Sequence, residues 1–361
     1  MVRLGAMGDI LHALPAVTAL RLAHPEWQIG WVVEPRWQAL LTSWGEETST
    51  GNQRPGTSEP ARSPEQPLVD RLHFAPAKQW GKRPLSLRTL RQIGALRRGL
   101  RACGYDAVID FQGAVRSAAI GRMAGAGRAI GESKPREWAA RWLFSERIET
   151  GGAHVIEQDV ELAGAVAGDQ LEPKAPLLPV DPLAEAWCDT LLASPPAGAG
   201  CRVALLTPGA GWGAKRWPIE RYAAVARGLA ERGLRVLINA GPGEEPLAAG
   251  IQSASGGIAV PVRPSLSQLI ALTRRIALCI AGDTGPLHLA CALGRPVVGI
   301  YGPTDPSRNG PYGARAVVLR SPLSRRDHSR RAEPESGLLT IGPEDVIQAA
   351  DTLLMEENSR R

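Results

Sequence analysis

Cysteine and long apolar runs are scarce in this sequence. Its five cysteines include no Cys-x-x-Cys pair, which argues against a disulfide framework and against a structural zinc site. No apolar run reaches the roughly 18–20 residues that a membrane-spanning helix needs, and the first residues lack the zones of a signal peptide. We therefore expect a cytoplasmic protein whose cysteines are mostly small buried hydrophobes.

Aromatic residues are also few, at 5% of the chain, whereas the net charge is +6 and the isoelectric point is near 9.3. This balance favours an anionic partner: a phosphorylated substrate, a nucleotide or an acidic membrane surface. Arginine pairs occur along the chain, but no nucleic-acid motif accompanies them, so we expect no nucleic-acid partner.

The 361 residues suit two domains. Apolar runs typical of buried strands alternate with helical patterns twice, before and after a proline-rich linker over Glu172–Pro182. We predict an α/β fold with domains over residues 1–175 and 183–342, followed by a helix in residues 343–361 that crosses back to the first domain. Residues 45–67 are polar and rich in Pro and Gly, which predicts a flexible insertion, and Ser321–Gly337 reads as a loop.

A strand, a tight turn and a helix are predicted around Gly282. The apolar run Ile276–Ala281 stops there, Thr284 can cap a helix, and Pro286 suits a first helical position. A helix that begins in this way exposes backbone N–H groups and its positive dipole end, so it can hold a phosphate. The alternative is an ordinary capped helix of an α/β core.

Two more loops of the second half follow predicted strands. Gly209–Lys215 is glycine-rich, includes Gly211, and places the Lys215 ammonium where it can meet a phosphate. Glu244 follows another strand end, a position at which a carboxylate often binds a ribose diol. The fingerprints of P-loop kinases and of dinucleotide oxidoreductases are missing, so the three loops together favour a nucleotide-activated substrate.

The first half places a carboxylate at a strand-to-helix junction. Val2–Leu4 is a short strand, which leads us to expect that the natural start lies upstream. Gly8 and Asp9 follow it, so Asp9 either works in the cleft above the sheet or only caps the helix. Farther on, a basic stretch that includes Lys82, Arg83 and Arg91 could contact an anionic acceptor or simply keep a helix soluble.

Five segments, taken in order, resemble glycosyltransferase family 9: Arg3–Pro15, Tyr105–Gly113, Lys215–Pro218, Asp283–Ala290 and Tyr301–Pro306. Within that family they are most similar to the lipopolysaccharide heptosyltransferases that add the first heptose. The resemblance implies a GT-B architecture, in which two Rossmann-like doubly wound domains face across a cleft. It also implies an ADP-heptose donor, a Kdo-lipid A acceptor, no cofactor, and a metal-independent, inverting single displacement.

The resemblance also assigns roles on the donor side. Thr284, Gly285 and Lys215 would hold the diphosphate leaving group in place of a metal ion. Asp283 would contact heptose hydroxyls, because a carboxylate turned onto phosphates would repel them. His288 would donate to the phosphates or else be a buried structural histidine. Glu244 would bind the ribose.

On the acceptor side, Asp9 would be the general base. Gly8, Gln112, Lys82, Arg83 and Arg91 would face the acceptor, whose phosphates and carboxylates need cations. Residues 45–67 and 321–337 match nothing in the family. Three alternatives stay open: a family member with another nucleotide sugar or a later acceptor, a non-catalytic nucleotide-sugar-binding protein, and a nucleotide-sugar epimerase. A lipid acceptor would bring the protein into transient contact with the inner membrane surface.

Overall fold

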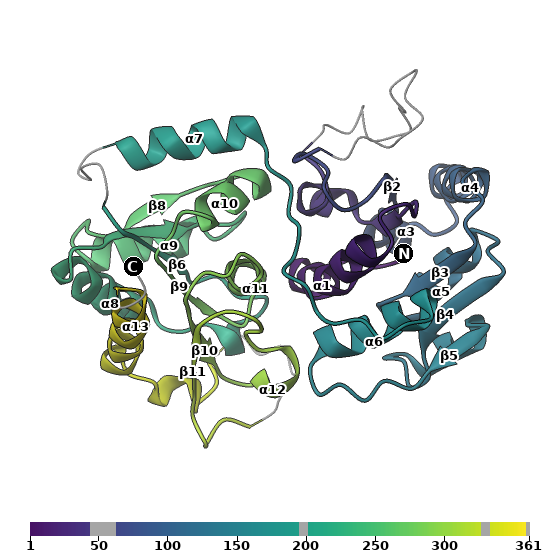
Figure 1. Cartoon of the computed structure of the whole chain (residues 1–361). Helices are drawn as coiled ribbons and strands as arrows, with labels where there is room; N and C mark the ends of the chain where they lie inside the picture. Colours follow the sequence, from purple (N-terminus) through teal and green to yellow (C-terminus); the bar gives the residue numbers. More distant parts are fainter. Residues whose placement is uncertain (44–62, 195–200, 326–332, 359–361) are drawn as a thin grey trace. The chain divides into compact units, whose positions relative to one another are not determined.

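The computed structural model describes residues 1–43, 63–194, 201–325 and 333–358. The chain divides into two compact units, Met1–Val180 and Asp181–Arg361. Each unit contains parallel strands covered by helices (Figure 1). The α/β fold class predicted from the sequence is therefore confirmed.

The sheet of the first unit is assembled around its first four residues. Val2 forms parallel bridges to Val32 and to Asp110, and its N–H donates to the carbonyl of Ile109 at 2.8 Å. Residues 1–4 thereby join two groups of parallel strands: β1 (Gly30–Val33) with β2 (Arg71–Phe74), and β3 (Ala107–Asp110) with β4 (Arg128–Glu132) and β5 (Glu146–Ile148). With residues 1–4 counted as the first strand, the strand order is 3-2-1-4-5-6, that of a Rossmann sheet.

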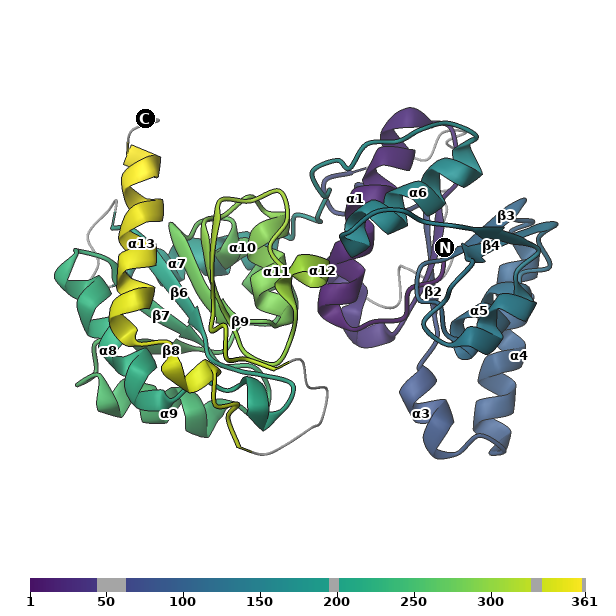
Figure 2. The ribbon, with the colours of Figure 1, turned by 90° about the horizontal axis from the view of Figure 1, so that it is seen from below.

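Helices cover both faces of this sheet (Figure 2). On one face lie α1 (Met7–Ala23) and α6 (Val155–Ala167). On the other lie α3 (Ala77–Lys82), α4 (Leu87–Ala102) and α5 (Val115–Arg122). A 3-10 turn over Trp138–Leu143 contacts α5, whereas a 3-10 turn over Pro35–Leu40 contacts α1. Residues 10–20 of α1 are all buried, and α1 packs along α6, which itself contacts β3 and β4.

The six strands that the structure describes in the second unit are all parallel. Their order is β8-β7-β6-β9-β10-β11, which is again 3-2-1-4-5-6. The central strands β6, β9 and β10 are buried along their whole length, as expected for a parallel sheet covered on both faces. The bounds are β6 (Val203–Thr207), β7 (Arg235–Asn239), β8 (Val260–Val262), β9 (Leu278–Gly282), β10 (Val297–Tyr301) and β11 (Ala316–Arg320).

The helices of the second unit form two layers (Figure 2). One layer consists of α7 (Pro182–Ala193), α10 (Leu266–Thr273) and α11 (Gly285–Ala292). The other consists of α8 (Ile219–Glu231), α9 (Glu245–Ala254) and α13 (Pro343–Asn358). Short turns lie at Gly213–Lys215, α12 (Pro306–Asn309) and Leu338–Thr340.

The final helix was expected to cross back to the first domain. In the structure α13 packs its apolar face on the second unit, where Val346, Ala350 and Leu353 join the buried core; its crossing back to the first domain stays a prediction. An ion pair between Arg232 and Asp351, at 2.6 Å, ties it to the end of α8. The core of the second unit therefore holds this helix.

Two predicted irregular segments differ in part from the structure. The linker expected over Glu172–Pro182 contains no helix or strand up to Asp181, and only Pro182 belongs to α7, whose N-cap Asp181 accepts from Leu183 N and Ala184 N. Residues 45–62 of the expected insertion lie outside the described residues, whereas residues 63–67 are turns in which Gln66 is buried. Of the segment 321–337, the described parts contain no helix or strand. Within the described ranges, no helix is both long and apolar enough to cross a membrane.

Candidate functional site

The second unit brings its predicted site residues to the point where the strand order reverses. Successive strands run outward from β6 through β7 to β8, and then from β9 in the opposite direction. Lys215 lies in the loop after β6, and Asp283 directly follows β9, which is the neighbour of β6. Ligands of open α/β sheets bind at such a switch point, beyond the carboxyl ends of the strands.

Lys215, Asp283 and His288 form one hydrogen-bonded group there. The Lys215 ammonium donates to the Asp283 carboxylate, and His288 Nε2 lies 3.3 Å from the other carboxylate oxygen. The three side chains are only 10%, 13% and 7% exposed. Burial alone would raise the pKa of Asp283, but the hydrogen bond from His288 and the charge of Lys215 lower it well below its usual range.

The helix α11 begins beside this group. Thr284 is its N-cap residue, but the Thr284 hydroxyl bonds to the carbonyl of Gly282 at 3.3 Å and does not cap the helix. The first-turn N–H groups thus lack a side-chain cap, and Pro286 has no N–H to satisfy. Gly285 stands at the first helical position, so the positive end of the helix lies next to Lys215 and Asp283.

Glu244 lies between the other two loops at this edge. Its Oε2 accepts from Gly241 N at 3.0 Å. Its carboxyl also lies against the Cα of Gly209, where an added Cβ would be only 1.9 Å from Oε1. A side chain at Gly209 would therefore displace the Glu244 carboxyl. A Cβ on Gly211 would meet no heavy atom within 4 Å, so the structure places no such demand on Gly211.

Trp212 is a member of this site that the sequence analysis missed. The Lys215 ammonium lies 4.3 Å from the centroid of its indole ring, in a cation–π contact. Trp212 Nε1 is buried and has no hydrogen-bond partner in the described structure. The signal was present in the sequence, since a lone tryptophan stands in a glycine-rich loop three residues before a lysine.

In the first unit, Asp9 lies in the first turn of α1. Its Oδ2 accepts from Ala6 N at 2.9 Å, and its Oδ1 lies 3.3 Å from Nη2 of Arg3. The Asp9 side chain is 40% exposed, while that of Arg3 is only 8% exposed. Gly8 precedes Asp9 in the same turn. Asp9 thus has a structural contact at the helix end and also an oxygen that solvent can reach.

Two buried carboxyls share the surroundings of Arg3. Burial raises the pKa of Asp110, which accepts from Gln112 N and Gly113 N. Burial also raises the pKa of Asp159 to about 7; the charge of Arg3 opposes this shift, and the carboxylates of Asp9 and Asp110 add to it. Sequence reasoning did not single out Arg3 or Asp159. Arg3 is a charged residue between Val2 and Leu4, whereas Asp159 stands in a polar stretch of α6 and gave no such signal.

The predicted acceptor residues do not form one group. Gln112 lies in the turn after β3, and its Oε1 accepts from Leu4 N at 2.9 Å, so it helps to hold residues 1–4. Lys82, Arg83 and Arg91 are exposed on α3, α4 and the turn between them. These elements cover the face of the sheet opposite α1 (Figure 2).

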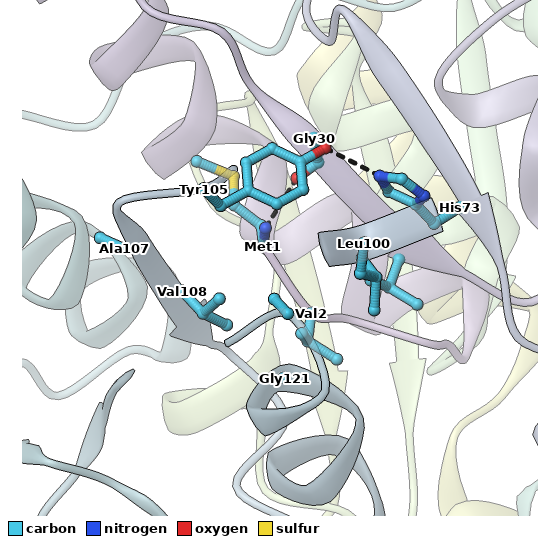
Figure 3. A pocket seen from close by; sticks show the side chains of 11 residues that line it. Met1, Val2, Gly30, His73, Leu100, Tyr105, Ala107, Val108 and Gly121 are labelled. Atoms are coloured by element: carbon cyan, nitrogen blue, oxygen red, sulfur yellow. Dashed lines mark hydrogen bonds between the residues drawn. The ribbon is translucent and has the colours of Figure 1, made fainter. Parts of the chain in front are cut away.

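A small cavity of about 10 Å³ lies in the core of the first unit (Figure 3). A hydrogen bond of 2.8 Å joins His73 Nε2 and the Tyr105 hydroxyl there, and the Met1 amino group donates to Gly30 O. Burial lowers the pKa of His73 to about 4. None of the predicted site residues lines this cavity, which has room for about one water. In the described part of the chain, no three His, Cys, Asp or Glu side chains are grouped as they would be to hold a metal ion.

Comparison with known proteins gives consistent matches. The sequence model of "Glycosyltransferase family 9 (heptosyltransferase)" matches residues 93–338. Lipopolysaccharide heptosyltransferase 1 of Escherichia coli K12 is 29% identical over 326 residues, which cover 89% of this chain and 93% of that protein. The corresponding enzyme of Pseudomonas aeruginosa is also 29% identical, over 89% of this chain and 83% of the relative.

Solved structures agree. The E. coli heptosyltransferase WaaC with ADP superposes with a TM-score of 0.75 at 26% identity, over 98% of each chain. E. coli ADP-heptose lps heptosyltransferase II, at 20% identity, has a TM-score of 0.73 and supports the fold alone.

Proposed function

The chain belongs to glycosyltransferase family 9, and from this premise we propose that it transfers heptose from ADP-L-glycero-D-manno-heptose to the Kdo-lipid A inner core of lipopolysaccharide. Relatives named lipopolysaccharide heptosyltransferase 1 and the likeness to WaaC with ADP support this proposal. The observation that carries it is the group formed by Lys215, Asp283 and His288 beside the uncapped start of α11.

This group suits the diphosphate of a nucleotide sugar. An ammonium has three N–H donors, so Lys215 can keep its contact with Asp283 and still donate to a phosphate oxygen. The N–H of Gly285 and the helix dipole add positive potential at the same place. As the bond from the sugar to the diphosphate breaks, negative charge grows on the leaving phosphate, and these groups stabilise it without a metal ion.

The remaining donor residues surround that position. The lowered pKa keeps Asp283 ionised, so its carboxylate can accept from heptose hydroxyls. Because His288 bonds to Asp283 in the structure, it orients that carboxylate and can also take part in phosphate binding. Glu244 is proposed to bind the ribose, with Gly209 and Gly211 keeping the loop backbone close to the nucleotide.

On the acceptor side, we assign the general base to Asp9. Its carboxylate takes the proton of the acceptor hydroxyl while the hydroxyl oxygen attacks the anomeric carbon and ADP leaves from the opposite face, which inverts that carbon. The Asp9 carboxylate stands in the first turn of α1, 3.3 Å from Nη2 of Arg3, and is 40% exposed, so an acceptor hydroxyl can reach it. Gly8 and Gln112 would line the acceptor position, and Lys82, Arg83 and Arg91 would meet anionic groups of the lipid at the cytoplasmic membrane surface.

The test of the donor site is ADP binding measured by calorimetry in a buffer with a chelator. We expect Lys215→Met to weaken ADP binding by about ten- to a hundredfold, because a hydrogen bond to a charged group contributes about 1.5–3 kcal/mol. Lys174→Met, which removes an exposed lysine of the linker, is the control and should bind ADP normally. Equal affinities for the two variants would refute the proposed role of Lys215.

A further inference from the structure

The turn between α3 and α4 carries apolar side chains that the core does not use. Leu85 is 86% exposed, Leu87 is 73% exposed and Leu90 is 51% exposed; we call these three residues the leucine tip. Figure 2 shows that α3 and α4 reach past the rest of the first unit and join at their far end, where the tip lies. Single exposed leucines are ordinary, but three within residues 85–90 of one protruding turn concentrate apolar surface in one place.

The apolar residues of α4 are divided between two uses. Leu96 and Leu100, toward the end of the helix, are buried in the core of the first unit. Leu87 and Leu90, in its first turn, face solvent. The beginning of α4 therefore displays leucines that contribute little to folding.

Polar contacts hold the turn in shape without the leucines. Ser86 is the N-cap of α4, and its hydroxyl oxygen accepts from Thr89 N at 3.1 Å. The buried Thr89 hydroxyl donates to the carbonyl of Arg83 at 2.8 Å. Trp80 Nε1 donates to Gln92 Oε1 at 3.0 Å and so joins α3 to α4. The tip is thus preformed, and replacing its leucines should leave the fold intact.

The charge around the tip has one sign. Residues 77–102 contain no Asp or Glu, and every Lys and Arg among them is exposed: Lys78, Lys82, Arg83, Arg88, Arg91, Arg97, Arg98 and Arg101. Exposed leucines surrounded by Lys and Arg are typical of peripheral helices that bind an anionic bilayer surface. In such helices the apolar side chains reach the acyl boundary, and the cations contact headgroup phosphates.

We propose that the leucine tip docks this protein on a bilayer that contains anionic lipids, with Leu85, Leu87 and Leu90 inserted at the level of the acyl boundary. The like charge of the surrounding surface opposes a second copy of the chain as the occupant, since two such faces would repel each other. Docking would bring the protein to its lipid acceptor, and this use of the surface rests on the proposed function. Binding to the bilayer itself does not require transfer activity.

The experiment measures sedimentation of the full chain with phosphatidylcholine vesicles that contain no anionic lipid or about 30% phosphatidylglycerol, and no lipid A. We expect binding to require phosphatidylglycerol and to decrease at about 0.5 M salt. The triple variant Leu85→Ser, Leu87→Ser, Leu90→Ser should partition at least about tenfold less, because its apolar area no longer enters the bilayer. Leu183→Ser is the control, since Leu183 is 82% exposed on α7 beside the acidic Glu185 and Asp189.

Each outcome decides the proposal. Equal partition of the triple variant and the wild type, with matching far-ultraviolet circular dichroism, would show adsorption by charge alone and overturn insertion. No binding of the wild type to anionic vesicles would also overturn it, as would wild-type dimers in light scattering that the triple variant lacks. A Kdo acceptor without acyl chains separates docking from the proposed transfer: the triple variant should use it as well as the wild type does. If the wild type binds vesicles but never uses that acceptor, the proposed function fails and docking stands.

Discussion

Replacement of Asp9 by Asn separates its proposed chemistry from its structural contact. Asp9 Oδ2 accepts from Ala6 N at 2.9 Å, which an amide oxygen can also do. An amide cannot take the proton of an acceptor hydroxyl, however. General base catalysis typically contributes about 10²–10⁴-fold, so we expect Asp9→Asn to lower kcat by that factor while leaving KM for ADP-heptose nearly unchanged.

The chain offers a matched control for this substitution. Asp345 stands in α13 where Asp9 stands in α1, at the third helical position, and its Oδ2 accepts from Gly342 N at 2.8 Å. Each Asn variant loses a carboxylate from the first turn of a helix, which should lower the free energy of unfolding by about 0.5–1 kcal/mol. Only Asp9→Asn should lower kcat.

The assay is steady-state ADP release at saturating donor and acceptor, together with urea unfolding of each variant. A fall in kcat for Asp9→Asn that is no larger than the fall for Asp345→Asn would refute the general-base assignment. Asp9 would then be a helix-capping residue only. A large rise in KM for ADP-heptose without a fall in kcat would likewise place Asp9 in donor binding instead of proton transfer.

Three further predictions concern buried charges and close contacts. The pKa of Asp159 in the folded chain, about 7, exceeds its unfolded value, so its stabilising contribution is complete below about pH 4 and is lost as pH rises through 7. The stability of Asp159→Asn relative to the wild type should therefore increase between pH 5 and 8 in urea unfolding, by about 1.4 kcal/mol for each pH unit up to 7, whereas a constant difference would contradict this pKa. For Asp283 the folded pKa lies below the unfolded value, so its contribution to stability is present above about pH 4 and is lost as pH falls below that value. In urea unfolding, the free energy of unfolding of Asp283→Asn should therefore fall less steeply below pH 4 than that of the wild type. Parallel curves of this free energy against pH would be evidence against the Lys215 and His288 contacts. Gly209→Ala should raise KM for ADP-heptose several-fold, because its Cβ would displace Glu244. Gly127→Ala is the control and should leave KM unchanged, because its Cβ meets nothing within 4 Å. Equal KM values for the two variants would show that Glu244 does not contribute to donor binding.

Local patterns were sufficient for the long apolar strands and the loops that follow them. The runs that became β6, β9 and β10 are buried on both faces and read as continuous apolar segments. Because the carboxyl ends of parallel strands meet at one edge, the loops with Lys215, Glu244 and Asp283 could be assigned to one site before the strand order was known.

Short edge elements could not be found in this way. In β2 only Leu72 is fully buried, and β5 has three residues, none of them fully buried, so neither gives a strong apolar signal. These strands exist because a neighbouring strand pairs with them, and such pairing depends on tertiary contacts that local sequence does not reveal.

The charged residues of the first unit show the same limit. Arg3 and Asp159 are far apart in sequence, and both are buried. Local patterns favour solvent exposure for charged residues, and only the packing of α6 against the sheet brings Asp159 under the influence of Arg3. The pairing of Lys215 with Asp283 was missed for a different reason, since each residue was assigned to a separate part of the donor.

The central claim is tested most directly by ADP release from ADP-heptose, with and without a Kdo-lipid A acceptor, in metal-free buffer that contains a chelator. The account predicts ADP release that depends on the acceptor and continues in the chelator. Binding of ADP-heptose without release of ADP, or release that needs an added divalent cation, would contradict it.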